Sequence, residues 1–247
     1  MSDVLAKLRT LTVARVGLGR CGNAIPTAPL LAFQAAHARA RHAIHDALDC
    51  EKLSAELAGL DPIVVASRVQ DRREFLQRPD LGRRLRSEDG ARLPHGPFDV
   101  VFVLADGLSA SALQAHAPHV LRHALSALQG WRVAPVVVAN QARVALGDDI
   151  AAGMGAAAVA VLIGERPGLA AADSLGVYVT WHPEIGTTDG ERNCISNIHG
   201  RGMSHDEAAG RLVWLLENAR AKGHTGVALK DEYRTPARSE LSQRDAS

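Results

Sequence analysis

The chain has 247 residues with a formal net charge of +1, and 47% of the residues are hydrophobic but only 4% aromatic. This length can bury one substantial core, and the balanced charge gives no electrostatic footprint for nucleic acid or an anionic membrane surface. The cysteines are odd in number and far apart, which argues against a disulfide scaffold and a CxxC zinc site. They are Cys21, Cys50 and Cys194. We expect no signal peptide and no membrane span.

The first 60 residues are predicted to form an N-terminal arm followed by helices. Residues 1–26 form the arm and end in a glycine-rich turn. Thr27 is a candidate cap for a helix over residues 28–48, which tolerates Pro29 in its first turn. A second helix is expected over residues 50–59.

Residues 61–235 are predicted to form an α/β domain, because apolar strand patterns alternate there with helical ones. The predicted strands are 61–69, 99–105, 134–139, 158–163 and 175–181, with a short edge strand at 226–229. The predicted helices lie within 72–85, over 109–128, over 148–154 and after Ser204, which forms a capping box with Glu207. This alternation predicts a mainly parallel, Rossmann-like sheet flanked by helices. A polar loop through Gly202 and a polar tail at 236–247 complete the prediction.

Ligands in open parallel sheets bind at the carboxyl ends of the strands. This rule selects four segments as the candidate site, namely 106–109, 140–147, 164–169 and 182–197. We therefore expect any functional residues of this chain to gather at that edge of the sheet.

Two of these segments offer carboxylates with two interpretations each. Asp106 follows a buried strand and is either a ligand or part of a helix cap, with Ser109 the better N-cap. Glu165 and Arg166 lie in a tight loop, where Glu165 either accepts hydrogen bonds from a ligand or forms a local ion pair.

Cys194 lies in an unusually polar segment, ERNCISN at 191–197. A nucleophilic cysteine needs a histidine base, and His182 and His199 are the nearby candidates. The backbone and amide groups of the segment suit a polar ligand equally well. A nucleophilic cysteine and a binding loop for a polar ligand are therefore both compatible with the sequence.

Two further patterns are weighed against simpler explanations. Gly17-x-Gly19-x-x-Gly22 matches a dinucleotide fingerprint, but neither a helix directly after it nor a second strand with an acidic end follows, so a glycine-rich turn is favoured. Histidines recur at helical spacing without the HExxH pattern of a zinc helix, so surface or interface roles are favoured over a metal site. They are His37, His42, His45, His116, His119 and His123.

Several segments together resemble the small (light) chain of ethanolamine ammonia-lyase over nearly the whole chain. The most specific are VLIGERPGLAAADSL at 161–175 and ERNCISNIH at 191–199, supported by RVALGDDI at 143–150. The resemblance implies a cobalamin-domain-like fold that binds adenosylcobalamin against a TIM-barrel large subunit in a hetero-oligomer. It implies radical conversion of ethanolamine to acetaldehyde and ammonia, with the substrate-contacting residues in the large chain and no catalytic residue or metal ligand here.

The resemblance also implies which residues contact the cofactor. The family's three cofactor positions match Val144, Glu165 and Cys194. We expect Val144 to pack against the corrin, Glu165 to accept hydrogen bonds, and Cys194 to offer a polarizable contact or a backbone N–H. The sequence has no D-x-H-x-x-G motif, so the cofactor's own dimethylbenzimidazole is expected to remain the lower cobalt ligand.

Two other functions stay open at this stage. One is a nicotinamide-dependent oxidoreductase that uses the glycine motif, and the other is a non-catalytic assembly subunit. The expected location is the bacterial cytoplasm. Location inside a microcompartment is left open, because the chain begins close to the first shared motif.

Overall fold

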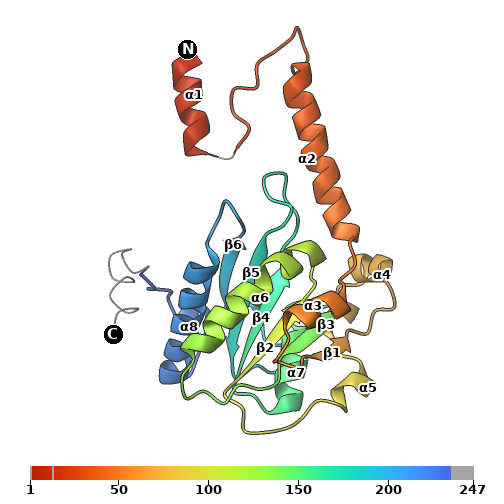
Figure 1. Ribbon diagram of the computed structural model, residues 1–247, viewed down its shortest axis with the longest axis vertical. Helices are drawn as coiled ribbons and strands as arrows, with labels where there is room; N and C mark the ends of the chain where they lie inside the picture. The colour runs from red at the N-terminus through yellow and green to blue at the C-terminus, as the bar shows by residue number, and fades with distance from the viewer. Residues whose placement is uncertain (1, 13, 235–247) are drawn as a thin grey trace.

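The computed structural model describes residues 2–12 and 14–234 (Figure 1). Six strands form one sheet in the order β1-β3-β2-β4-β5-β6. Their bounds are β1 Ile63–Ala66, β2 Val100–Ala105, β3 Val137–Asn140, β4 Ala158–Gly164, β5 Leu175–Trp181 and β6 Asn193–Ile198. The predicted α/β class is confirmed, since helices cover both faces of this sheet (Figure 1).

The sheet is mixed, which corrects the expectation of a mainly parallel sheet in part. Strands β1, β3, β2 and β4 run parallel, whereas β5 is antiparallel to both β4 and β6. Parallel neighbours need a long crossover, usually a helix, but residues 165–174 join β4 to β5 without one. The short connection therefore returns the chain as an antiparallel hairpin. The closer likeness to Rossmann or cobalamin domains stays a prediction.

The helices occupy most of the segments that the sequence indicates. Their bounds are α1 Ser2–Leu11, α2 Thr27–His45, α3 Cys50–Glu56, α4 Arg72–Gln77, α5 Ser87–Gly90, α6 Ala110–Ala127, α7 Leu146–Met154 and α8 His205–Lys222. Short 3-10 turns are η1 Leu81–Arg83, η2 Asp189–Glu191 and η3 Gly226–Ala228. Ser109 and Ser204 cap α6 and α8 by accepting the backbone N–H groups of Ala112 and Glu207, as predicted for N-caps.

The N-terminal segment differs from its prediction in two ways. Residues 2–11 of the expected arm form helix α1. Thr27 is the first residue of α2 rather than its cap, since Pro26 occupies the N-cap position and no side chain caps the helix. Figure 1 shows α2 projecting away from the sheet. Helix α3 instead joins the main core through Leu53 and Leu57. The predicted tail at 236–247 lies outside the described residues.

The sheet separates two hydrophobic clusters. On one face, α3, α6 and α8 pack against residues such as Phe102 and Leu162. On the other, α7 packs through Leu146 and Ile150 against residues such as Val161. Strands β2 and β4 are buried on both faces, which explains their continuous apolar runs.

Strand β6 is the main element that the sequence does not reveal. Its buried residues Ile195 and Ile198 are three apart rather than two, so the segment reads as a polar loop. The cause is a bulge, because Leu175 pairs with Ile198 while Val177 pairs with Ile195. The predicted edge strand at 226–229 is also wrong, since a 3-10 turn occupies Gly226–Ala228.

No helix in the described part of the chain combines the length and the hydropathy that crossing a membrane requires.

A buried ion pair fastens the β5–β6 hairpin to α7. Arg192 donates to both carboxylate oxygens of Asp148 at 2.8 and 2.7 Å, and both side chains are 1% exposed. The guanidinium also donates to Thr180 Oγ1 and to the carbonyl oxygen of Thr187 at 2.8 Å each. These bonds offset most of the cost of burying the charge, although Nε of Arg192 has no hydrogen-bond partner among the described residues.

Replacing Asp148 should therefore destabilise the fold strongly. Asp148→Ala leaves the buried guanidinium without its counter-ion, and we expect the free energy of unfolding to fall by about 3–5 kcal/mol in urea unfolding of the purified chain. Asp189→Ala is the matched control, because its 99% exposed carboxylate lies 4.0 Å from the same guanidinium. Equal losses in both variants would contradict a dominant role for the buried pair.

Candidate functional site

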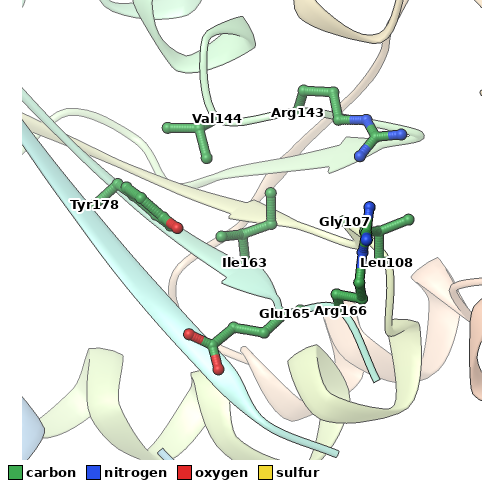
Figure 2. Close-up of a pocket in the computed structure, with 9 residues that line it drawn as sticks. Gly107, Leu108, Arg143, Val144, Ile163, Glu165, Arg166 and Tyr178 are labelled. Carbon is green, nitrogen blue, oxygen red and sulfur yellow. The ribbon is translucent and has the colours of Figure 1, made fainter. Parts of the chain in front are cut away.

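A groove lies on the face of the sheet that α7 covers only in part, beside the β5–β6 hairpin. One cavity of about 440 Å³ opens between the carboxyl ends of β2 and β4 and the face of β5 (Figure 2). Its apolar lining includes Leu108, Val144 and Ile163. A second cavity of about 870 Å³ shares Arg143, Val144 and Tyr178 with the first and extends toward Ile185. The two cavities form one continuous surface for a large ligand or a partner.

Val144 lies in the loop between β3 and α7, and backbone contacts hold this loop on both sides. The N–H of Ala142 donates to Asp106 Oδ1 at 3.0 Å, and the N–H of Arg143 donates to the carbonyl oxygen of Gly82 at 2.8 Å. The Val144 side chain lines both cavities, as Figure 2 shows for the first. The loop thus offers a fixed apolar contact to the groove.

Glu165 is the first residue after β4, and one of its carboxylate oxygens is already engaged. Oε2 accepts from Ser174 Oγ at 2.5 Å and lies 3.4 Å from the N–H of Asn197. Oε1 has no hydrogen-bond donor among the described residues and lies 3.0 Å from where a Cβ of Gly176 would stand. The missing side chain at Gly176 therefore makes room for Glu165, whose free oxygen can accept a ligand's hydrogen bond.

Tyr178 and Cys194 form a cross-strand pair on the open face of the hairpin. Tyr178 lines both cavities, whereas Cys194 adjoins them through this pairing. Sequence reasoning missed Tyr178. Side chains alternate along a strand, so the apolar neighbours Val177 and Val179, which enter the main core, indicate that Tyr178 faces the other side of the sheet. The structure thus brings Val144, Glu165 and Tyr178 to one groove, with Cys194 at its border.

Cys194 is poorly suited to be a nucleophile. Burial raises the pKa of its thiol, so the reactive thiolate is disfavoured at neutral pH. His182 follows the end of β5, and the antiparallel direction of β5 puts it at the opposite edge of the sheet from Glu165. The prediction that segment 182–197 lies at the carboxyl edge is therefore wrong for its beginning, and only the end of β6 returns there.

Asp106 is a buried structural group rather than an exposed ligand. Its side chain is 4% exposed, and it lies 3.3 Å from Arg72 Nη1 in addition to accepting the Ala142 N–H. Burial raises the pKa of Asp106 to about 6. The carboxyl group thus joins α4 to the β3–α7 loop, while Ser109 caps α6.

The wall of the groove beside Asp106 depends on two glycines. A Cβ at Gly164 would overlap the carbonyl oxygens of Ser109 and Asp106, and a Cβ at Gly107 would overlap the carbonyl oxygen of Gly164. Gly107 also has a positive φ of 54°. The two backbones can approach this closely only because neither residue has a side chain.

The glycine and histidine motifs do not assemble a site of the kinds considered. Helix α1 rather than a strand precedes Gly17, and the next helix begins at Thr27, so the dinucleotide context is missing. The histidines of α6 instead meet α8, where His116 Nδ1 lies 3.0 Å from His205 Nε2 and His123 pairs with Asp206 at 2.5 Å. The described residues contain no group of three or more His, Cys, Asp or Glu that could hold a metal ion.

The raised pKa of Asp106 predicts a specific pH dependence. Between 3.8, its ordinary value, and about 6, the folded chain keeps a proton that the unfolded chain has lost. The contribution of Asp106 to stability therefore falls as pH rises through this window, by roughly 3 kcal/mol at about 1.36 kcal/mol per pKa unit. Unfolding free energies measured from pH 4 to 7 should show wild type losing that amount relative to Asp106→Asn.

Asp99→Asn is the control with the opposite sign. A hydrogen bond from Arg132 lowers the pKa of Asp99, so wild type should gain stability relative to this variant as pH rises through the acidic range. A difference between wild type and Asp106→Asn that does not change with pH would contradict the assignment.

Comparison with known proteins is consistent with this geometry. The model of the ethanolamine ammonia-lyase light chain family matches residues 2–230. Proteins named ethanolamine ammonia-lyase small subunit are similar throughout: one from Rhodopseudomonas palustris is 53% identical over 92% of this chain and 90% of the relative. One from Xanthomonas campestris is 49% identical over 95% of this chain and 90% of the relative. This chain belongs to the ethanolamine ammonia-lyase light chain family.

Proposed function

We propose that this chain is the small subunit of an adenosylcobalamin-dependent ethanolamine ammonia-lyase, which converts ethanolamine to acetaldehyde and ammonia together with a large subunit. In this proposal the large subunit, a TIM barrel, binds the substrate, and the present chain covers the cofactor in a hetero-oligomer. The family membership supports the reaction class. The observation that carries the cofactor assignment is the groove that brings Val144, Glu165 and Tyr178 together.

The residues of the groove fit the chemistry of a corrin. A corrin is a wide, flat macrocycle with amide-bearing side chains, and it needs an open apolar surface with acceptors at its edge. The uncovered face of β5–β6 and the side chain of Val144 offer the surface, and the free Oε1 of Glu165 offers an acceptor for an amide N–H. Cys194 adds a polarizable contact beside Tyr178.

In this proposal the chain holds and shields the cofactor and supplies no reacting group of its own. When bound, adenosylcobalamin supplies radical chemistry through homolysis of its cobalt–carbon bond. Of the two reactive candidates, Cys194 has a thiol whose pKa is raised, which disfavours the reactive thiolate, and Asp106 is buried in a structural contact. No histidine in the sequence has an Asp two positions before it. The sequence therefore has no D-x-H-x-x-G loop that could replace the cofactor's own base as the lower cobalt ligand.

The two other functions can be separated from this one by experiment. The glycine motif lacks the strand that a nicotinamide site requires, which disfavours the oxidoreductase. A pure assembly subunit would leave a large subunit that binds cobalamin and turns over without this chain. Co-expression with a large subunit, followed by size-exclusion chromatography with and without adenosylcobalamin, tests both. We expect a complex that retains the corrin only when both chains are present.

Substitutions in the groove should weaken cobalamin binding by the co-purified complex. Glu165→Ala removes a charged acceptor and should raise the Kd about tenfold or more. Val144→Ala removes apolar contact area and should raise it by up to about tenfold. Glu217→Ala, on the exposed side of α8, is the matched control and should bind as wild type does. Unchanged cobalamin affinity in both groove variants, measured by corrin absorbance after equilibrium dialysis, would overturn the assignment.

A further inference from the structure

One end of the groove carries positive charge that the described residues do not neutralise. Arg143 and Arg166 line the first cavity, and Figure 2 shows their guanidinium groups beside Gly107 and Leu108, away from Tyr178 and the Glu165 carboxylate. The first cavity is therefore polarised, with an acceptor on one side and cations on the other.

The hydrogen-bonding capacity of this end is only partly used. Nε of Arg143 is buried and has no hydrogen-bond partner among the described residues, while its Nη2 donates to the carbonyl oxygen of Phe75 at 3.2 Å. Nη2 of the neighbouring Arg72 is likewise buried without a partner. Arg166 is exposed, and no acceptor in the described part of the chain contacts it. A buried donor left without a partner is costly, which points to an acceptor that arrives with a ligand.

The electrostatics agree with this geometry. Burial lowers the pKa of Arg143, and the positive charges of Arg72, Arg83 and Arg166 lower it further. The carboxyl group that offsets this repulsion, Asp106, is already engaged by Arg72 and by the Ala142 N–H. The ring of Phe75 lies under the Arg143 guanidinium, 4.2 Å from centroid to Cζ, and keeps this side chain in place. An anion here would relieve the repulsion among the arginines.

We propose that Arg143 and Arg166 bind a phosphodiester, namely the one in the nucleotide loop of the corrin cofactor. This inference rests on the proposed function. The phosphodiester is the anionic group of that cofactor, and guanidinium groups bind phosphate oxygens through two parallel hydrogen bonds. The apolar side chains of Leu108 and Ile163 lie beside the same end of the cavity and suit the adjoining aromatic base. In this proposal Arg143 and Arg166 thus determine the orientation of the cofactor in the groove.

The test compares three corrinoids on the complex with the large subunit. Cobalamin has the whole nucleotide loop, cobinamide phosphate has the phosphate without the base, and cobinamide has neither. We expect Arg166→Gln and Arg143→Gln to raise the Kd about 10- to 100-fold for cobalamin and for cobinamide phosphate, because each removes a charged hydrogen bond. Cobinamide should bind the variants as it binds wild type. Arg143→Lys should recover only part of the loss, since it restores charge without the bidentate geometry.

Controls make each outcome decisive. Arg73→Gln removes the same charge from an exposed position next to Arg72 and should change none of the three Kd values. Arg166 is exposed, so its variant tests the proposal even where Arg143→Gln impairs folding. Equal losses for all three corrinoids, or a loss of subunit assembly without corrinoid, would overturn the phosphodiester assignment in favour of a partner carboxylate. Wild type binding none of the three would instead refute the cobalamin function itself.

Discussion

The connection from β4 to β5 contains no helix, and the position of the groove depends on this constraint. A parallel β5 would require a crossover helix, which would cover the face of the sheet that Tyr178 and Cys194 occupy. The chain instead returns as an antiparallel hairpin, so α7 covers β2 and β4 while Tyr178 of β5 and Cys194 of β6 are left partly or fully exposed. The buried pair of Arg192 and Asp148 then holds the hairpin and α7 at a fixed separation.

The groove that results combines three kinds of contact in one place. Within the first cavity, Glu165 offers a free carboxylate oxygen on one side, apolar side chains lie in the middle, and two guanidinium groups lie on the other side. A ligand that carries amides, a broad apolar surface and one anionic group matches this order. Among the described residues of the groove none is an activated nucleophile, because desolvation raises the pKa of the Cys194 thiol and disfavours its thiolate. These features agree with the proposed function, in which the chain positions a cofactor and leaves bond breaking to the cofactor and the larger partner.

The N-terminal segment suits a subunit that works within a complex. Helix α2 projects from the sheet (Figure 1). Leu30, Leu31 and Phe33 are exposed along its first half. Arg15 in the arm donates to the carbonyl oxygen of Leu169, so the arm is joined to the same connection that follows Glu165. Apolar residues exposed along a projecting helix are typical of surfaces that a partner covers.

The amino-acid sequence alone determined the α/β class, the buried strands and the serine caps of α6 and α8, because continuous β-branched runs and capping serines act through local physics. Resemblance to a family then indicated Val144 and Glu165, and both line one cavity. Only the tertiary structure decided the rest. The bulge in β6 breaks the alternation of buried and exposed residues that would identify a strand in the sequence. Cys194 is therefore predicted to lie in a loop, and only the structure shows that it pairs with Tyr178. Likewise, Arg143 and Arg166 are 23 positions apart in the printed numbering, and nothing local joins them. They become neighbours in one cavity because parallel strands bring their carboxyl ends to a common edge.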